Sequence, residues 1–409
     1  MALGKLMKKK IYNLINKKNK SKIVSLTAYS KNIATILDDF CDLILVGDSL
    51  GSVLYNYKST RAVTLNAMIE HSKSVRMGIK KSLMVVDMPH NTYRTSKEAL
   101  KNAKKIISKK DYKIGQFKKS ALFSTYIWSL HAGPYHIFTD SKAKYPSRLF
   151  VRDSLKQYVK VDDWFTFTRQ GFEFLNDYFG YEYPYVKYDQ LIVPDFNAGA
   201  MENVAAVTFS ERFINRGIKS QKERRRLANV IYHEMAHMWF GNLVTMNWWD
   251  DLWLNESFAT YMANLGVATN TEFKEQAWRD FNGTKSWAYW EDQLVTTHPI
   301  VADVPDTSQA FANFDGITYG KGASSLKQIH YFLGNESFRA GLQFYFKKYA
   351  NQNTKLRDFI SSLEKGSKRN LKDWQEKWLQ TTGVNTIQTK FECAEGKITS
   401  FELSQKDQN

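Results

Sequence analysis

The chain is poor in cysteine and has no long apolar run. Only two cysteines, Cys41 and Cys393, stand in 409 residues, too few for the disulfide framework of a small secreted protein. We therefore expect a reducing, cytoplasmic location. No stretch approaches the roughly 20 apolar residues of a membrane-spanning helix, so we expect no membrane association. Hydrophobic residues still make up 43% of the chain, enough to bury a substantial core.

Acidic residues and tryptophan are scarce in the first quarter of the chain. Residues 1–110 contain 22 Lys and Arg against 7 Asp and Glu, a net charge of +15, whereas the other 299 residues contain 36 against 34, a net charge of +2. All eleven tryptophans lie at or beyond Trp128. This break in composition indicates two parts of different origin, joined near residues 105–115 without a Pro/Gly-rich linker. We hypothesise that the reading frame joins two unrelated gene fragments.

The basic excess of the first part is scattered lysine, with few arginines and no stacking aromatic residues between them. A specific nucleic-acid site combines cationic side chains with aromatic rings on which bases stack. We therefore expect no specific nucleic-acid partner, although non-specific attraction to polyanions stays open. The oligomeric state is also left open by the sequence.

The second part contains the spacing of a zinc site. His233 and His237 stand four residues apart in the run HEMAH, and Glu256 follows nineteen residues after the second histidine. Residues four apart share a face of a helix, so both imidazoles can bind one metal ion. Catalytic Zn²⁺ commonly takes two histidines and a glutamate and keeps a fourth position for water. We predict that these three residues bind zinc and that Glu234 is the general base; the alternative is a solvated helical face.

Three motifs in order resemble the M1 family of zinc metallo-aminopeptidases: the GAMEN run, the run from HEMAH to NESFATY, and the run GITYGKG. The resemblance covers about residues 112–409. It implies hydrolysis of N-terminal residues from peptides that have a free N-terminus. It also favours Tyr319, in GITYGKG, as the catalytic residue that donates to the oxyanion, over a packed core tyrosine.

The GAMEN run is expected to bind the substrate. It comprises Gly199, Ala200, Met201, Glu202 and Asn203. A carboxylate at Glu202 can bind the cationic amino group of a peptide, so that one residue lies between this group and the scissile bond. The small Gly199-Ala200 backbone can hydrogen-bond the substrate as an added strand.

Three polar residues near the third ligand, Asp250, Asp251 and Asn255, are candidates for orienting the imidazoles. The sequence does not discriminate among them.

We expect a mixed fold. The M1 resemblance implies the end of an N-terminal β-domain at residues 111–148, a thermolysin-like α+β catalytic domain at 149–385, and the start of a β-sandwich domain at 386–409. Alternation predicts a strand within residues 124–138, and a hairpin should turn at Glu395-Gly396. Helices are expected at Val161–Tyr178, Gln221–Phe240, Ser257–Val267, Gly320–Leu333 and Leu371–Thr381. Most of the family's N-terminal β-domain and its C-terminal helical domain have no counterpart, so we expect an incomplete enclosure around the site.

Residues 1–110 alternate between strand and helix patterns. Apolar strands are expected at residues 22–27, 42–47 and 82–87, with helices near 33–40 and 65–80. The second and third strands end at Asp48 and Asp87. Parallel β/α proteins place their chemistry at such strand ends, although each aspartate alone is typical of a helix N-cap.

The runs LILVGDSLGSVLYNY and LMVVDMP resemble the N-terminal part of the ketopantoate hydroxymethyltransferase family, a (β/α)₈ barrel that binds Mg²⁺ and a keto acid. The resemblance implies that Asp48 and Asp87 bind magnesium and that both, with Ser49, contact the substrate. A barrel needs about 250 residues, so we expect a truncated, inactive barrel fragment with an unpaired sheet edge. The leading hypothesis is therefore a zinc aminopeptidase. Hydroxymethyl transfer to a keto acid, or zinc binding without turnover, are the alternatives.

Overall fold

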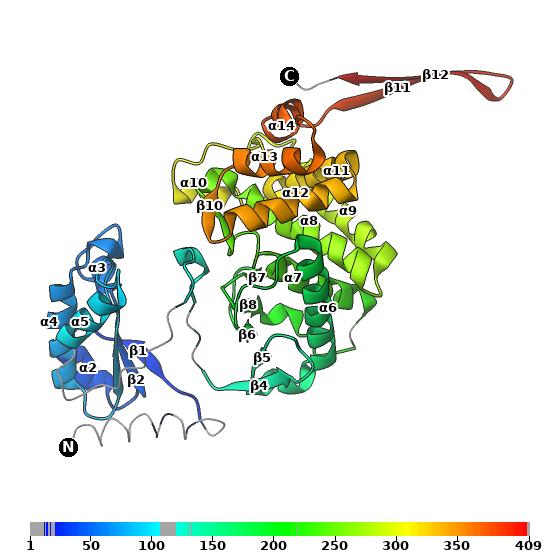
Figure 1. Ribbon diagram of the computed structural model, residues 1–409. Helices are drawn as coiled ribbons and strands as arrows, with labels where there is room; N and C mark the ends of the chain where they lie inside the picture. Colours follow the sequence, from blue (N-terminus) through cyan, green and yellow to red (C-terminus); the bar gives the residue numbers. More distant parts are fainter. Residues whose placement is uncertain are drawn as a thin grey trace. The chain divides into compact units, whose positions relative to one another are not determined.

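The computed structural model describes residues 12, 14, 17, 21–106, 120–129, 131, 133–218 and 220–406. Contacts divide the chain into two units, Met1–Lys119 and Ser120–Asn409 (Figure 1). Each unit has its own hydrophobic core. Most of the join that we predict at residues 105–115 lies outside the described residues.

The first unit contains an open parallel sheet. Its strands are β1 (Ser25–Thr27), β2 (Leu43–Val46) and β3 (Leu83–Val86), in the order β1-β2-β3. The helices are α2 (Lys31–Leu37), α3 (Leu50–Val53), α4 (Leu65–Gly78) and α5 (Ser96–Ile106), with a 3₁₀ turn η1 (Thr60–Ala62). The three predicted strands and two predicted helices are therefore present.

The sheet of the first unit is covered incompletely. Ile44 and Val46 of β2 are fully buried, whereas Leu26 of β1 is 46% exposed and Val85 of β3 is 38% exposed. Among the described residues, the outer edges of β1 and β3 have no strand partner. Unpaired edges and bare apolar side chains are what a partial β/α sheet leaves behind.

The second unit begins with a five-stranded sheet in the order β4-β5-β6-β8-β7. The strands are β4 (Tyr135–Asp140), β5 (Ser147–Arg152), β6 (Tyr188–Val193), β7 (Ala200–Met201) and β8 (Ala206–Ser210). Strands β5, β6 and β8 run parallel, while β4 and β7 are antiparallel to their neighbours. The short strand β7, which carries part of the GAMEN run, forms one edge of the sheet.

The strand predicted within residues 124–138 is only partly correct. Thr125–Ile127 form a 3₁₀ turn (η2), and strand β4 starts at Tyr135. Gly133 and Pro134 interrupt the alternation, because proline cannot donate to a strand ladder. The carbonyl of Ile127 instead accepts the backbone N–H of Val204 at 3.0 Å, so this turn packs beside the GAMEN loop.

The helices of the second unit mostly follow the sheet in the chain, although the first of them lies between β5 and β6. They are α6 (Val161–Phe179), α7 (Gln221–Ala236), α8 (Trp253–Asn270), α9 (Lys274–Glu291), α10 (Thr307–Ala312), α11 (Gly322–Leu333), α12 (Asn335–Tyr349), α13 (Leu356–Ser367) and α14 (Lys372–Leu379). Short elements between them are η3 (Asp153–Tyr158), η4 (Glu211–Phe213), β9 (Val244–Met246), η5 (Trp249–Asp251), η6 (Ile317–Lys321) and β10 (Gln352–Thr354). All five predicted helices are present, with ends shifted by several residues.

Helix α8 is the centre of this helical layer. Fourteen of its residues are buried, and it packs against α7, α9 and α11. A helix that is buried on nearly every side belongs to the core, which makes α8 a rigid base for the side chains that it carries. Helix α7 starts at a capping box, in which Ser220 and Glu223 satisfy each other's backbone N–H groups.

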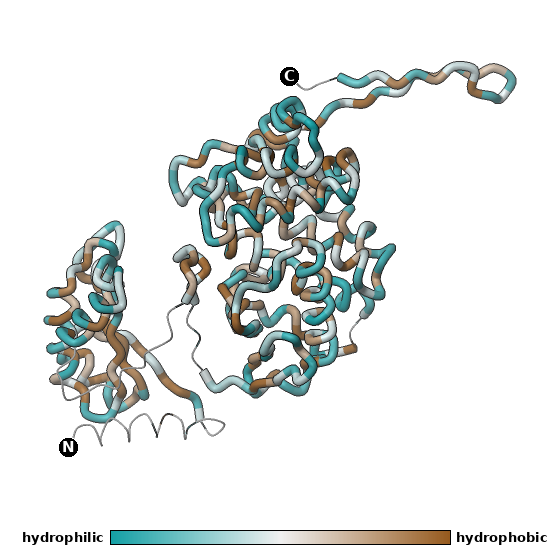
Figure 2. Tube along the Cα trace, viewed as in Figure 1, coloured by the Kyte–Doolittle hydropathy of each residue, from teal (hydrophilic) through white to brown (hydrophobic). Residues whose placement is uncertain are grey.

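The chain ends in the antiparallel hairpin of β11 (Thr386–Ala394) and β12 (Lys397–Lys406), as predicted. Gly396 at its turn has φ +75°. Both strands are exposed along their whole length, and apolar residues alternate along them (Figure 2). No helix in the described part of the chain has both the length and the apolar character needed to cross a bilayer.

Candidate active site

Two imidazoles and one carboxylate meet between α7 and α8. Nε2 of His233 lies 3.1 Å from Nε2 of His237. Oε2 of Glu256 lies 3.3 Å from the first of these nitrogens and 3.4 Å from the second. The structure therefore brings together the three residues that we predict as zinc ligands. We call their three atoms, the two Nε2 atoms and Oε2 of Glu256, the ligand triangle.

The spacing of these three atoms suits a tetrahedral metal ion. Ligands bound to Zn²⁺ at about 2.0–2.1 Å with tetrahedral angles lie about 3.3–3.4 Å from one another. The observed triangle, with sides of 3.1 to 3.4 Å, is close to this size. Oε2 of Glu256 is buried and has no hydrogen-bond partner among the described residues. A buried carboxylate oxygen of this kind is normally paired or bound to a metal.

Asn255 orients one imidazole. Nδ1 of His237 donates to Oδ1 of Asn255 at 2.6 Å and lies 3.1 Å from the carbonyl of Phe240. With the proton on Nδ1, the lone pair of Nε2 points into the ligand triangle. Of the three candidates for this task, Asn255 makes the contact.

The two aspartates near Asn255 do not touch the imidazoles. Asp251 accepts the indole N–H of Trp253 at 3.2 Å and the backbone N–H of Leu356 at 2.9 Å. Neither Asp250 nor Asp251 forms a hydrogen bond to a histidine among the described contacts. Asp251 instead ties α8 to the start of α13, where burial raises the pKa of its carboxyl to about 6.

Glu202 lies beside the triangle and is 4% exposed. Its Oε1 accepts the side-chain N–H of Asn255 at 3.0 Å, and its backbone carbonyl accepts that of Asn242 at 2.9 Å. With Glu234 and His237 it forms a second compact group, whose ligand atoms all lie within 4.8 Å of one another. Glu202 thus lies on the His237 side of the site.

Tyr126 is a site residue that sequence reasoning missed. Its hydroxyl accepts the side-chain N–H of Asn255 at 3.3 Å and lies near the Glu202 carboxylate. Burial, and then the charge of Glu202, raise the pKa of Tyr126 well above its ordinary value. Its position in the 3₁₀ turn η2, far from the motifs in sequence, gave no signal that could have identified it.

Glu234 is 4% exposed, and its Oε2 has no hydrogen-bond partner among the described residues. Burial raises the pKa of this carboxyl well above its ordinary value; the charge of His237 lowers it, and Glu202 raises it further. The position of Glu234 beside His233 on α7 places an unpaired basic oxygen next to the ligand triangle.

Tyr319 reaches the site from the π-turn η6. Its ring stacks against that of His233, with centroids 6.1 Å apart and planes 18° apart, and its hydroxyl lies near the Glu256 carboxylate. Burial raises the pKa of Tyr319 well above its ordinary value, so the hydroxyl keeps its proton at neutral pH. Single π-turns inside helices frequently mark functional sites.

Several contacts fix this π-turn. Oδ1 of Asp315 accepts the backbone N–H groups of Ile317 and Thr318 at 3.0 and 2.9 Å. On α8, Ser257 donates through Oγ to the carbonyl of Thr318 at 2.5 Å. Since Ser257 follows Glu256 directly, this bond holds the turn of Tyr319 against the helix that carries the third ligand.

Gly241 makes the close packing around Asn255 feasible. Its φ of +115° is one that only glycine readily adopts. A Cβ atom there would overlap Oδ1 of Asn255 and would lie 3.0 Å from the hydroxyl of Tyr126. We expect Gly241→Ala to lower the free energy of unfolding by about 1–3 kcal/mol. Zinc affinity should fall about 10- to 100-fold as His237 loses its orienting partner.

Thermal unfolding and a zinc titration against a competing chelator measure these two effects. Gly283→Ala is the matched control, because a Cβ at Gly283 on α9 meets no atom within 4 Å and alanine is the better helix former. Equal stabilities of the two variants would contradict the role given to Gly241.

In the first unit, Oδ2 of Asp87 accepts the backbone N–H of Asp48 at 3.3 Å, and Oγ of Ser49 lies 2.8 Å from the hydroxyl of Tyr29. Burial raises the pKa of Asp87. The predicted residues therefore lie together at the ends of β2 and β3. Their magnesium and substrate roles stay predictions: both metal-sized groups of three found among the described residues lie in the second unit.

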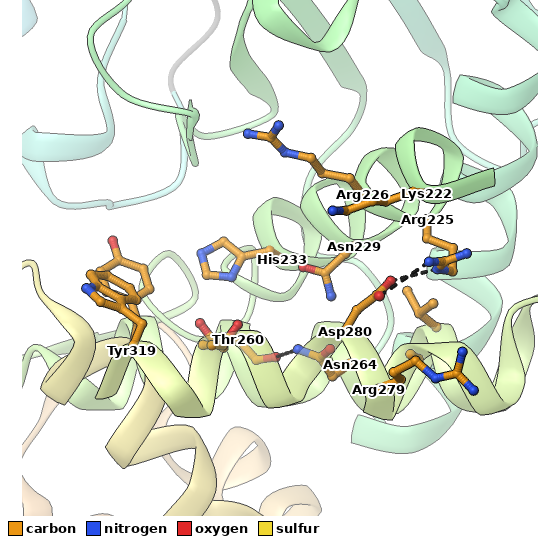
Figure 3. A pocket seen from close by; sticks show the side chains of 15 residues that line it. Lys222, Arg225, Arg226, Asn229, His233, Thr260, Asn264, Arg279, Asp280 and Tyr319 are labelled. Atoms are coloured by element: carbon orange, nitrogen blue, oxygen red, sulfur yellow. Dashed lines mark hydrogen bonds and ion pairs between the residues drawn. The ribbon is translucent and has the colours of Figure 1, made fainter. Parts of the chain in front are cut away.

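A groove of about 560 Å³ opens from the ligand triangle, with His233 and Tyr319 at one end (Figure 3). Helices α7 and α9 form its walls, and Thr260, Asn264 and Val267 of α8 contribute to its lining. Sequence reasoning did not identify this groove.

Both parts of the chain match models of known protein families. Residues 165–378 match the model of the peptidase family M1 domain, and residues 8–119 match that of ketopantoate hydroxymethyltransferase. Both resemblances predicted from the motifs are thereby confirmed.

Aminopeptidase N of Streptomyces lividans is 45% identical over 300 residues, which cover 72% of this chain and 35% of that protein. Glutamyl aminopeptidase of Rattus norvegicus is 34% identical over 287 residues, 68% of this chain and 29% of that protein. For the first part, 3-methyl-2-oxobutanoate hydroxymethyltransferase of Pelagibacter ubique is 80% identical over 103 residues, 25% of this chain and 40% of that protein.

The chain thus spans about a third of the length of the curated aminopeptidases that it matches. The M1 model nevertheless covers more than half of the 409 residues, including the ligand triangle, the GAMEN run and Tyr319. By this match, the chain belongs to peptidase family M1.

Proposed function

We propose that this chain is a zinc-dependent aminopeptidase that removes N-terminal residues from peptides. The observation that carries the proposal is the triangle of His233, His237 and Glu256 atoms, with sides of 3.1 to 3.4 Å. Glu234 and Glu202 lie on its flanks with carboxylate oxygens directed to the same small volume. This donor set fits Zn²⁺, which favours nitrogen and carboxylate ligands in tetrahedral geometry.

Glu202 would hold the amino group of the substrate. A cationic amine that enters the buried pocket needs a charged partner, since burying a charge alone is costly. A hydrogen bond from Asn255 fixes the Glu202 carboxylate, and the Tyr126 hydroxyl lies near it. An amine bound there leaves room for one residue before the ligand triangle, which gives cleavage after the first residue.

The edge strand β7 would bind the peptide backbone. Among the described residues its outer edge has no strand partner, so the backbone groups near Ala200 are free to hydrogen-bond an extended peptide. Gly199 lies against the Arg212 guanidinium, which a Cβ at this position would overlap. The peptide would thus bind as an added strand, with the amino group of its first residue at Glu202.

When bound, Zn²⁺ supplies a Lewis acid that polarises the scissile carbonyl and makes water a better nucleophile. Oε2 of Glu234 would take one proton from the attacking water and deliver it to the nitrogen of the leaving amine. The Tyr319 hydroxyl would donate to the oxygen of the scissile carbonyl as negative charge develops there. The proton is returned, so Glu234 ends each cycle as it began.

The test is to purify the full chain, measure zinc by mass spectrometry, and assay hydrolysis of alanine p-nitroanilide. We expect about one zinc per chain, loss of hydrolysis on chelation, and recovery on addition of zinc. Zinc binding without hydrolysis would contradict the proposal and support the alternative of a zinc-binding protein without turnover. Activity that persists after zinc has been removed would contradict the proposed chemistry.

A further inference from the structure

The groove that leads away from the ligand triangle is strongly basic. Helix α7 contributes Lys222, Arg225 and Arg226 to its lining, and α9 contributes Arg279 and Asp280 (Figure 3). Arg225 pairs with Asp280 through an Nε to Oδ2 distance of 2.6 Å, which neutralises both. Lys222, Arg226 and Arg279 form no ion pair with any described residue.

The unpaired cations are aligned with the ligand triangle. Lys222, Arg226, Asn229 and His233 follow one another at intervals of four, three and four residues, so they share one face of α7. Arg226 therefore lies two turns, about 10 Å, from His233 along the helix axis. An extended peptide covers that length in about three residues.

Cationic side chains also lie between the groove and the edge strand β7. The guanidinium carbons of Arg212 and Arg226 lie 5.5 and 5.4 Å from the centre of the Phe213 ring. Arg212 also lies against Gly199 at the start of the GAMEN run. Cationic side chains thus extend from the edge that would bind the peptide backbone to the wall of the groove.

The direction in which a peptide would lie follows from the residues on either side of the ligand triangle. Glu202, the proposed amine partner, groups with His237 and Glu234 and does not line the groove. His233 and Tyr319 do line it. A peptide whose amino end is at Glu202 would cross the ligand triangle and continue into the groove with the residues that follow the scissile bond.

From this geometry we infer that the groove selects peptides with carboxylates downstream of the cleaved bond, at about the second to fourth residues, through Arg226 and Arg279. The inference rests on the proposed aminopeptidase function. The carboxylates are either acidic side chains or the C-terminal carboxylate of a short peptide. Guanidinium groups suit both, because they bind carboxylates in a bidentate geometry.

Binding can be measured apart from catalysis. The full chain carrying Glu234→Gln would be titrated with Ala-Ala-Glu-Glu-Ala that carries a fluorescent group at its C-terminal end, and with the Gln-Gln and Lys-Lys versions, by fluorescence anisotropy. At low salt we expect the Glu peptide to bind about three- to tenfold more tightly than the Gln peptide, and the Lys peptide most weakly. Equal affinities would overturn the inference.

A charge-matched pair of variants separates the groove from the general positive charge of the chain. In Arg226→Gln/Arg279→Gln the affinity ratio of the Glu and Gln peptides should fall toward one. The control, Lys274→Gln/Arg357→Gln, removes two exposed cations that do not line the groove and should keep the ratio. A ratio that survives in the groove variant, or falls equally in both, would overturn the inference.

Turnover by the unmodified chain provides the remaining comparisons. The rates of hydrolysis of Ala-Ala-Ala with a free C-terminal carboxylate and with an amidated C-terminus are compared. Faster hydrolysis of the free form identifies the C-terminal carboxylate as the favoured group, and equal rates leave acidic side chains as that group. Alanine p-nitroanilide places no peptide in the groove. If the chain hydrolyses alanine p-nitroanilide but shows no preference among the peptides, the groove inference is wrong and the proposed function stands. If it does not hydrolyse alanine p-nitroanilide but still binds the Glu peptide more tightly than the Gln peptide, the proposed function is wrong and the groove inference stands.

Discussion

Glu234→Gln should lower kcat for alanine p-nitroanilide by about 10²–10⁴-fold, the usual contribution of a positioned general base. Glutamine has nearly the same shape, but its amide cannot take a proton from water. The carboxylate that it replaces is 4% exposed and has an oxygen without a hydrogen-bond partner among the described residues. The loss therefore reports proton transfer at this atom.

Zinc content should stay at about one per chain in the Glu234→Gln variant, because Glu234 contributes no atom to the triangle of three ligands. Glu275→Gln, an exposed glutamate on α9, is the matched control and should leave kcat within twofold, as surface changes usually do. Retained activity, or loss of zinc together with activity, would show that Glu234 is not the base.

The parts of the site that the sequence predicts are those that local geometry determines. His233 and His237 stand one helical turn apart, so their common face follows from the helix alone. Glu256 was predictable because a zinc site needs a third ligand and the chain offers one at a helix start. The ketopantoate hydroxymethyltransferase-like strands were predictable for a similar reason: short apolar runs that end at Asp48 and Asp87 are typical of parallel β/α units.

What the sequence does not reveal depends on contacts between distant segments. Tyr126 stands 76 residues before Glu202, in a segment whose alternation predicts a strand, yet it forms a 3₁₀ turn that packs beside the GAMEN loop. The basic groove is a similar case. The spacing of Lys222, Arg226 and His233 was visible in the sequence, but the facing wall on α9 comes from packing against α8.

The two units differ in how completely their elements are covered. In the second unit α8 is buried along most of its length and carries Glu256, Asn255 and Ser257, so the ligand, its orienting neighbour and the anchor of the Tyr319 turn share one rigid helix. The first unit has its predicted aspartates side by side, but its sheet keeps two unpaired edges among the described residues. Rigid support of catalytic groups is a requirement of catalysis, and the buried helix α8 gives the second unit such support.

Tyr319→Phe should lower kcat by about 10²–10³-fold, the usual cost of removing one donor to a developing oxyanion. Phenylalanine keeps the ring that stacks on His233 and removes only the hydroxyl. KM for alanine p-nitroanilide should change little, because the donation strengthens as charge develops on the carbonyl oxygen rather than when the substrate binds.

The control for Tyr319→Phe is Tyr331→Phe on α11, whose side chain is 92% exposed and should leave both kinetic constants within twofold. Zinc content and thermal stability of the two variants should match, since the phenyl ring in place of Tyr319 would preserve the packing of the π-turn. An increase in KM with unchanged kcat would assign Tyr319 to substrate binding instead. A loss of zinc would mean that its hydroxyl acts by holding Glu256, near which it lies, rather than by stabilising the transition state.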